Sequence, residues 1–348
     1  MKFKTIPYKG SKRKLLDTIL SITQEIEATT FLDGFSGTGI VSANMRHHGY
    51  KVSANDKMTS ANLYSRVFLR GFERQSVAEH VSIINKLDPV AGWLTKNYSG
   101  TAKRIIRGTN GSIQDRPLGF FRKNTMKIDA AREYVESIGD SRTKEAVIFS
   151  IVLAANKVFN NSNDQKSSFK DWSKASMRDV EFEMPTLVEG HVGKTFSGNV
   201  LDLEEREFDV VYLDPPYTTG VLYDSCYHIN ESIVLWDKPP LDHSYAIPRP
   251  ERVCFRKNGQ NAGDFYIKSR AMADFTKLLS SFRAKRIILS YSDAPRNVLT
   301  YDELSGICQG IGSLRIISKD HQLCSQVKSM NKISESLREF FFIIDLVT

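Results

Sequence analysis

Residues 30–56 read TFLDGFSGTGIVSANMRHHGYKVSAND, and this stretch decides the fold. A short apolar run ends at Asp33, a glycine-rich turn follows, and apolar residues at helical spacing predict a helix from Ile40 to His48. Tyr50–Ala54 is a second short strand that ends in Asn55-Asp56. Strand, glycine turn, helix, strand and acid form the opening of a parallel βαβ unit, so we expect a doubly wound, mostly parallel α/β sheet.

Further segments extend this sheet. Phe208–Leu213 (FDVVYL) and residues 286–292 (RIILSYS) are continuous apolar runs, which are typical of parallel strands buried on both faces. The other predicted elements are a closing strand at 338–347 and helices at 12–28, across most of 57–94, at 133–160 and near 269–283, while 161–178 and 218–268 are irregular.

Polar residues follow the predicted strands, namely Asp33, Asp56, Asp214 and Ser290. In an open parallel sheet the carboxyl ends of the strands meet at one edge, and ligands bind in the crevice outside it. We therefore expect the functional site at this edge.

The positive charge of the chain is concentrated in one segment. Residues 95–132 contain nine Lys or Arg and two Asp, a net charge of +7, against +8 for the whole chain. This segment is inserted between predicted strands and can neutralise the phosphates of a nucleic acid. A solvated basic face is the alternative.

Composition excludes several other classes of protein. Hydrophobic residues make up 41% and charged residues 25%, which is ordinary for a globular chain and excludes a collagen-like or disordered one. No run approaches the ~20 apolar residues of a membrane span, and we find no secretory signal. Cys226, Cys254, Cys308 and Cys324 form no C-x-x-C pair and have no zinc-ligand spacing with a histidine, so we expect reduced thiols and no metal.

The glycine turn favours a nucleoside-containing ligand. Its order is Gly-x-x-Gly-x-Gly, the reverse of the dinucleotide-binding order, and no Lys-Ser/Thr pair ends it as in a P-loop. Asp56 follows about 20 residues later, where an acid can accept hydrogen bonds from ribose hydroxyls. An ordinary tight turn and a solvated turn acid are the alternatives for these two features.

A second motif, Asp214-Pro215-Pro216-Tyr217, ends the buried strand FDVVYL. The two prolines stiffen the chain and remove two amide donors. The Asp214 carboxylate and the Pro215 carbonyl then offer two acceptors, which suit an amine with two N–H donors such as N6 of adenine. Tyr217 offers a ring on which a base can stack. The alternative is a proline-stiffened turn with an incidental Asp and Tyr.

Together these motifs resemble those of the S-adenosylmethionine-dependent DNA adenine-N6 methyltransferases. Asp33-x-Phe35-x-Gly37-x-Gly39, a long insertion and then Asp214–Tyr217 follow the order of the alpha group, the Dam-like and restriction-modification adenine methylases. Residues 7–12 (PYKGSK), 223–239 and 289–292 also resemble segments of that group. The resemblance covers blocks across most of residues 5–300.

The resemblance implies S-adenosylmethionine as the cofactor. Phe35 matches the aromatic residue beside the methionine moiety, and Asp56 matches the ribose-binding acid. Many relatives have an acid that reads the adenine amine of the cofactor; here Asn199 takes that place, with Asp202 as the alternative. The implied cofactor-binding residues are Tyr8, Lys12, Asp33, Phe35, Ser36, Gly37, Thr38, Gly39, Asp56 and Asn199.

The resemblance further implies double-stranded DNA as the substrate and a catalytic domain in two pieces. Residues 1–70 and 179–348 would form the catalytic domain, residues 71–178 a largely helical, basic recognition region, and 218–268 a further DNA-contacting loop. A structural role is an equal alternative for Tyr227 and His228. The expected DNA-contacting residues are Lys103, Arg104, Arg107, Arg122, Lys123, Tyr227 and His228.

The expected activity is transfer of a methyl group to N6 of an adenine flipped out of the duplex. Asp214 and the Pro215 carbonyl would hold the amine, Tyr217 would stack on the base, and no covalent enzyme intermediate is needed. The resemblance implies a cytoplasmic, nucleoid-associated protein of a bacterium or phage, either solitary or paired with a cognate restriction endonuclease. Cytosine-N4 methylation, RNA adenine methylation and a catalytically idle DNA-binding module are the alternatives, and the glycine order disfavours a dinucleotide-dependent oxidoreductase.

Overall fold

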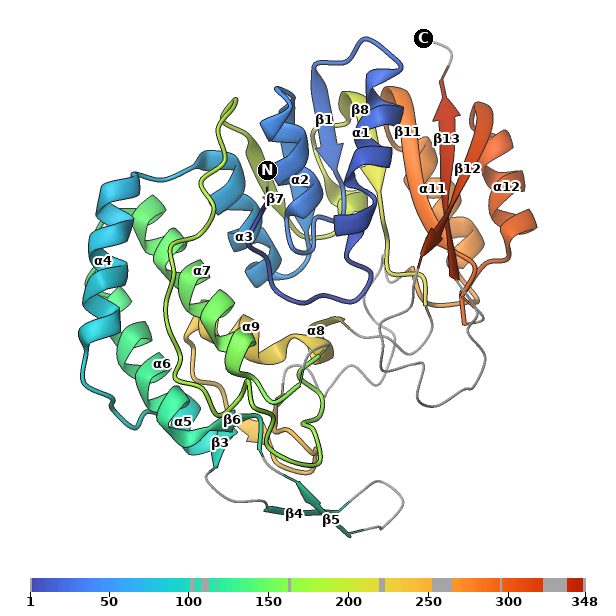
Figure 1. Cartoon of the computed structure of the whole chain (residues 1–348). Helices are drawn as coiled ribbons and strands as arrows, with labels where there is room; N and C mark the ends of the chain where they lie inside the picture. Colours follow the sequence, from blue (N-terminus) through green and yellow to red (C-terminus); the bar gives the residue numbers. More distant parts are fainter. Residues whose placement is uncertain are drawn as a thin grey trace.

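A seven-stranded sheet lies at the centre of the computed structural model, with helices on both of its faces (Figure 1). The structure describes residues 2–100, 104–107, 113–116, 118–161, 164–218, 223–251, 265–294, 296–321 and 337–346. The strand order is β12-β13-β11-β8-β1-β2-β7. These strands are β1 Thr30–Asp33, β2 Lys51–Asp56, β7 Lys194–Ser197, β8 Glu207–Leu213, β11 Arg283–Ser292, β12 Ser313–His321 and β13 Leu337–Asp345.

The sheet is doubly wound and mostly parallel. Strands β7, β2, β1, β8 and β11 run parallel, and β13 is antiparallel to both of its neighbours. The chain passes from β1 to β2 on one side and from β8 to β11 on the other, so the direction of winding reverses between β1 and β8. The predicted fold class is confirmed, and this reversal point is where such sheets bind ligands.

Helices and short strand pairs complete the fold. The helices are η1 Lys12–Lys14, α1 Leu16–Gln24, α2 Ile40–His47, α3 Thr59–Arg70, α4 Arg74–Lys86, α5 Trp93–Tyr98, α6 Arg122–Val135, α7 Ser141–Val158, η2 Val200–Asp202, α8 Tyr223–Cys226, α9 His228–Leu235, α11 Ala271–Ser280 and α12 Tyr301–Gln309. The short pairs are β3 Ser99–Gly100 with β6 Phe120–Phe121, β4 Arg104–Arg107 with β5 Ile113–Arg116, and β9 Leu241–Asp242 with β10 Arg249–Pro250.

The position of β8 in the middle of the sheet explains the apolar run in its sequence. Val210 and Tyr212 belong to the hydrophobic core on one face of the sheet, whereas Val211 and Leu213 belong to the core on the other. Because successive side chains of a strand point to opposite faces, the stretch of a central strand that is covered on both sides is apolar at every position, as in 210–213.

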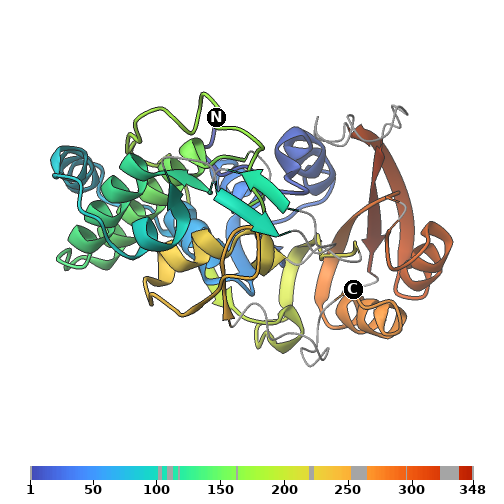
Figure 2. The same cartoon turned by 90° about the horizontal axis from the view of Figure 1, so that it is seen from below.

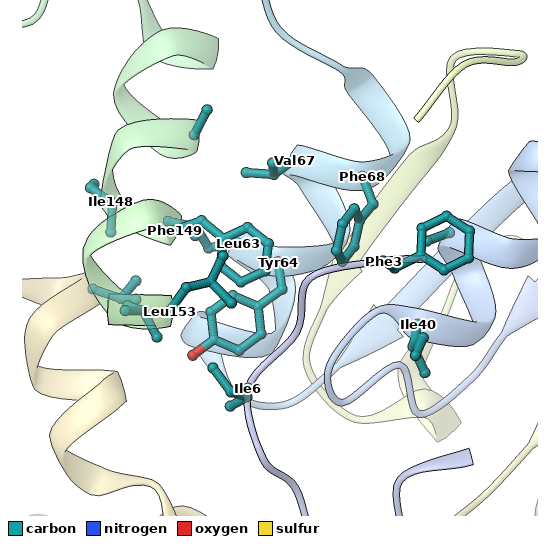
Figure 3. Close-up of a cluster of buried hydrophobic side chains, with 14 of the residues drawn as sticks. Phe3, Ile6, Ile40, Leu63, Tyr64, Val67, Phe68, Ile148, Phe149 and Leu153 are labelled. Atoms are coloured by element: carbon teal, nitrogen blue, oxygen red, sulfur yellow. The ribbon is translucent and has the colours of Figure 1, made fainter. Parts of the chain in front are cut away.

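The predicted recognition region shares its core with the catalytic sheet. Tyr64 of α3 stacks on Phe149 of α7, with ring centroids 4.8 Å apart, and Phe68 of α3 meets the same ring edge-on (Figure 3). Phe3 of the N-terminal segment packs on Phe68 from the opposite side. Seen from below, the helices of residues 59–158 lie at one end of the sheet and strands β12 and β13 at the other (Figure 2).

Several elements differ from the sequence predictions. Strands β7 and β12 and helix α12 were not predicted, and helix α9 lies inside 218–268, which was expected to be irregular. Helix α6 begins at Arg122, inside the basic segment. Strands β7 and β12 lie at the two edges of the sheet, where half-exposed polar residues hide the apolar pattern.

The sequence also predicts no membrane span, no metal site and reduced thiols. Among the described residues, no helix is long and apolar enough to cross a bilayer, and no group of three or more His, Cys, Asp or Glu side chains is arranged to hold a metal ion. Cys226 and Cys308 are buried free thiols. Cys254 and Cys324 lie outside the described residues.

Candidate active site

A cavity of about 420 Å³ lies at the carboxyl edge of the sheet, where β1, β2 and β8 end. The predicted site residues that line it are Tyr8, Lys12, Asp33, Phe35, Ser36, Gly37, Thr38, Asp56, Asn199, Asp214, Pro216 and His228. Gly39, Pro215, Tyr217 and Tyr227 are not among the lining residues. The structure therefore brings most of the predicted cofactor residues together with Asp214 around one cavity.

The glycine turn between β1 and α2 requires glycine at two positions. Gly37 and Gly39 have φ angles of 50° and 70°, a region that residues with a side chain rarely adopt. A Cβ at Gly39 would lie 3.0 Å from the Phe68 ring, and one at Gly37 would lie 3.2 Å from the Tyr8 ring. The turn is thus fixed by its backbone conformation and by close packing on both sides.

Asp33 is a buried acid beneath this turn, and its side chain is 1% exposed. Its Oδ2 accepts hydrogen bonds from the amide and hydroxyl of Ser42, at 3.1 and 2.6 Å. Its Oδ1 is buried and has no hydrogen-bond partner among the described residues. Burial raises the pKa of Asp33 to about 7, against the lowering effect of the Ser42 hydrogen bond. A positively charged or N–H-bearing ligand in the cavity would satisfy this oxygen.

Asp56 joins the end of β2 to the glycine turn. Its Oδ2 accepts a hydrogen bond from the Gly37 amide at 2.8 Å, and its Oδ1 accepts one from the Met58 amide at 2.9 Å. Burial raises the pKa of this carboxyl group. The Lys57 amide also hydrogen-bonds to this carboxylate. A carboxylate has about four acceptor positions, so one remains for a ligand in the cavity that Asp56 lines.

Asn199 precedes η2 and lines the cavity. Its side-chain oxygen accepts a hydrogen bond from the Leu201 amide at 3.1 Å. Asp202, the alternative for the same role, is exposed and does not line the cavity. The geometry therefore supports Asn199 at this position.

A stack of tyrosine rings holds the N-terminal segment over the glycine turn. The Tyr8 ring lies 4.4 Å from that of Tyr227 and 5.4 Å from that of Tyr223. The Tyr227 hydroxyl accepts a hydrogen bond from the Lys9 amide at 2.7 Å.

The predicted DNA contacts of Tyr227 and His228 disagree with their burial. Tyr227 is 2% exposed and His228 is fully buried, with its two ring nitrogens 2.9 and 3.0 Å from the carbonyl oxygens of Ser225 and Pro248. Burial lowers the pKa of His228 to about 4, which keeps the ring neutral. The structural role left open by the sequence is the one that this geometry supports.

The predicted catalytic motif forms the far wall of the cavity. Lys12, whose side chain is 5% exposed, places its Nζ 3.0 Å from Oδ1 of Asp214 and 3.1 Å from Oε1 of Glu339 on β13. Burial raises the pKa of Asp214 to about 6, Lys12 opposes this shift, and Glu339 adds to it. Lys12, predicted from its place near the cofactor, thus contacts the predicted catalytic acid directly.

The remaining residues of the motif divide between the cavity and the core. Pro215 is buried, and Pro216 lines the cavity. The Tyr217 ring packs on Tyr291 of β11 with centroids 4.3 Å apart. In this arrangement one side of the Tyr217 ring is covered by Tyr291.

The predicted DNA-binding side chains of the recognition region fall in several environments. Arg122 and Lys123 are exposed at the start of α6, and Lys123 pairs with Asp179 at 2.6 Å. The backbone of Arg104 and Arg107 lies in strand β4, and Lys103 lies outside the described residues. Arg132, counted in the net charge of the segment, is buried and donates to the carbonyls of Ile233 and Val234. Part of that charge is therefore structural.

Sequence reasoning missed three polar residues that build this site. Glu231 of α9 accepts hydrogen bonds from the Thr59 and Ser60 amides, which fixes the start of α3. Asn55 donates to the carbonyls of Gly34 and Gly198 at 3.1 and 3.3 Å. Glu339 lies beside Lys12. Asn55 next to Asp56 was a local signal, whereas the partners of Glu231 and Glu339 are too distant in sequence to be inferred.

The sheet, the glycine turn after its first strand and the cavity at the reversal point define a class I, Rossmann-like methyltransferase fold. The model of the D12 class N6 adenine-specific DNA methyltransferases matches residues 8–288. The chain belongs to this family, as its motifs predicted, and the cofactor of the family is S-adenosylmethionine.

Relatives with curated descriptions are modification methylases. The chain is 26% identical to modification methylase LlaI of Lactococcus lactis subsp. lactis over 313 residues, which cover 85% of this chain and 47% of that protein. It is 25% identical to the type II methyltransferase M.FokI of Planomicrobium okeanokoites over 367 residues, 96% of this chain and 52% of that protein. It is 29% identical to the type II methyltransferase M.NlaIII of Neisseria lactamica over 252 residues, 66% of this chain and 69% of that protein. The chain thus spans about half the length of the first two relatives.

The residues around the cavity fit S-adenosylmethionine. The unpartnered Oδ1 of Asp33 offers an acceptor to a cationic group, and the remaining acceptor position of Asp56 suits a ribose hydroxyl. Phe35 adds an apolar wall beside them. A volume of about 420 Å³ lies within the ~300–1,000 Å³ range of sites for small ligands.

Proposed function

We propose that this chain methylates N6 of adenine at a specific sequence in double-stranded DNA, with S-adenosylmethionine as the methyl donor. The observation that carries the proposal is the position of Asp214, which lines the same cavity as the glycine turn and Asp56. A base amine bound at Asp214 and a cofactor bound at Asp56 would therefore meet inside one cavity.

The residues of the site divide into two groups with different tasks. Asp33, Phe35 and Asp56 bind the cofactor, Asn199 accepts a hydrogen bond from its adenine amine, and the glycine turn approaches it closely. Asp214 and the Pro215 carbonyl each accept one N–H of the target amine. When bound, S-adenosylmethionine supplies an electrophilic methyl group on a sulfonium.

Methyl transfer then depends on position and charge. The two acceptors fix the N6 amine and increase the electron density on a nitrogen whose lone pair is otherwise delocalised into the ring. N6 would form a bond to the methyl carbon as the bond from that carbon to sulfur breaks, and N6 would then lose a proton. The Asp214 carboxylate is placed to accept this proton, and its pKa of about 6 allows release to solvent at neutral pH.

The target adenine must leave the base stack to reach this cavity. Exposed basic side chains of the recognition region, Arg122 and Lys123 among them, would hold the DNA backbone. The similarity of this chain to a modification methylase and to type II methyltransferases supports a role beside a cognate restriction endonuclease.

The test is expression of the protein in a methylation-free host, followed by mapping of modified bases in the host DNA by long-read sequencing. We expect N6-methyladenine at one short recognition sequence, and none when Asp214→Ala is expressed to the same level. Modified N4-cytosine instead would redirect the proposal to that amine. Absence of any modified base with a folded, cofactor-binding protein would contradict it.

A further inference from the structure

Glu339 contacts Lys12, the partner of Asp214 in the predicted catalytic motif, and it lies in a part of the chain that the family match does not reach. It belongs to β13, opposite Ser292 of β11, and follows the matched residues 8–288. Its side chain is 4% exposed, and its Oε1 lies 3.1 Å from Nζ of Lys12. Lys12 in turn lies 3.0 Å from Asp214, so a single buried cation is shared by two carboxylates.

The position of Glu339 is itself fixed. The Ser290 hydroxyl donates a hydrogen bond of 2.5 Å to Oε1 of Glu339. Ser290 is fully buried in β11, two residues before the strand ends. It was predicted at a strand end, and the proposed reaction gives it no role. The chain Ser290–Glu339–Lys12–Asp214 therefore links two strands of the sheet to the acid that faces the cavity.

We propose that Glu339 is a positioning residue for methyl transfer, which holds Lys12 against Asp214 and moderates the charge that Lys12 exerts on it. This inference rests on the proposed function. With Glu339 present, the three groups carry a net charge of −1, and Asp214 shares the cation. Without it, Lys12 would pair with Asp214 alone and withdraw electron density from the oxygens that must accept the target amine.

Because the three groups are buried, each of their charges strongly affects the other two. Ion pairs are weakly screened where solvent is excluded, and a buried charge that loses its partner is strongly destabilising. A hydrogen bond to an ionised acceptor is roughly twice as strong as one between neutral groups. The state of the Asp214 carboxylate therefore sets how firmly the amine is held.

Other ionisable groups also face Asp214. Tyr212 precedes it on β8, Tyr217 follows it, Tyr223 of α8 lies across the cavity, and Asp33 lies at the end of β1. Burial raises the pKa of each tyrosine, so these rings stay neutral through the pH range of the test. Asp33 is a second acid that titrates in this range, and it is unchanged in every variant compared.

The test is the pH profile of kcat with DNA carrying the recognition sequence, because the profile of kcat reports ionisations in the bound complex. Glu339→Gln removes the like charge, so we expect the acid limb to move down by about one pH unit and kcat at neutral pH to fall about tenfold. Lys12→Met removes the cation, so the acid limb should move up by one unit or more. KM for DNA and the affinity for cofactor should change less than twofold in Glu339→Gln.

The matched control is Asp345→Asn on the same strand. Asp345 also pairs with a buried cation, Arg286, at 2.6 Å, but it contacts neither Lys12 nor Asp214. We expect its kcat and its acid limb to match the wild type. A structural contribution of β13 alone would lower stability in both variants and leave both acid limbs in place.

The outcomes separate this inference from the proposed function. If the wild type modifies adenine and Glu339→Gln keeps the wild-type kcat and acid limb, or shifts the limb upward like Lys12→Met, Glu339 has no positioning role. If the wild type modifies no adenine, the proposed function fails first. Should Glu339→Gln not fold, Glu339→Asp carries the test, because it withdraws the charge by one methylene and should move the limb downward by a smaller step.

Discussion

Replacement of Asp56 by alanine should weaken cofactor binding at least tenfold. A hydrogen bond to a charged group contributes about 1.5–3 kcal/mol, and 1.4 kcal/mol is a factor of ten in affinity. Asp56 accepts hydrogen bonds from the amides of Gly37, Met58 and Lys57 and lines the cavity, so about one of its four acceptor positions remains for a ribose hydroxyl. Loss of one ribose hydrogen bond therefore predicts about a tenfold to hundredfold rise in Kd.

The substitution also removes the acceptor of three backbone amides, so a second variant is needed to separate the two effects. Asp56→Asn keeps one acceptor oxygen, so its affinity for the cofactor should lie between those of the wild type and Asp56→Ala. Isothermal titration with S-adenosylmethionine measures both affinities. Thermal unfolding of the same samples reports how much stability is lost when the turn loses its hydrogen bonds to Asp56. Asp17→Ala, which removes an exposed acid from α1, is the control for a change of charge. An unchanged Kd in Asp56→Ala with a lowered Tm would refute the ribose role and leave Asp56 as a turn-fixing acid.

Three further changes test the turn, the DNA-binding surface and a buried histidine. Gly39→Ala should lower the free energy of unfolding, measured by urea titration, by about 1–2 kcal/mol or more. Gly49→Ala should lower it less. Both glycines have a positive φ, but only at Gly39 does a new Cβ meet neighbours within 4 Å. If Arg122 and Lys123 both contact phosphates, their joint replacement by alanine should lower the log–log salt slope of DNA binding by about 1.8. The control Lys51→Ala should leave the slope unchanged. An unaltered slope in the double variant would show that neither side chain contacts the DNA backbone. Burial lowers the pKa of His228 in the folded state to about 4, below the ordinary histidine value of about 6.5. Its contribution to the free energy of unfolding is therefore fully present above pH 6.5 and falls by about 3 kcal/mol as the pH drops toward 4. His228→Gln should remove that part of the slope, and an identical pH dependence in both proteins would contradict it.

The sequence was sufficient for the central parallel strands and the cavity edge because their signals are local, whereas it did not predict the edge strands β7 and β12. A strand, a glycine turn and a helix follow one another within residues 30–48, and Asp33, Asp56 and Asp214 each stand where a strand ends. Winding of a parallel sheet then brings strand ends together without further information.

Contacts between distant segments could not be derived in this way. The pairing of Lys12 with Glu339 joins residues at opposite ends of the chain, and nothing near either residue indicates the partner. Tyr227 and His228 have the composition of a surface recognition motif, but both are buried: Tyr227 stacks on Tyr8, and the imidazole nitrogens of His228 lie against the carbonyl oxygens of Ser225 and Pro248. Residue type suggested a DNA contact where tertiary packing produced a structural one.

The segment of residues 8–12 connects the two halves of the proposed reaction. At one end Tyr8 packs against Gly37 of the cofactor turn, and at the other Lys12 binds Asp214. Tyr227, from the chain after the catalytic motif, stacks on Tyr8 and accepts the Lys9 amide, so three parts of the sequence fix this segment. A shift of the segment would change the fit at the glycine turn and the charge at Asp214 together. The proposed cofactor site and the proposed amine site are therefore joined by the five residues 8–12.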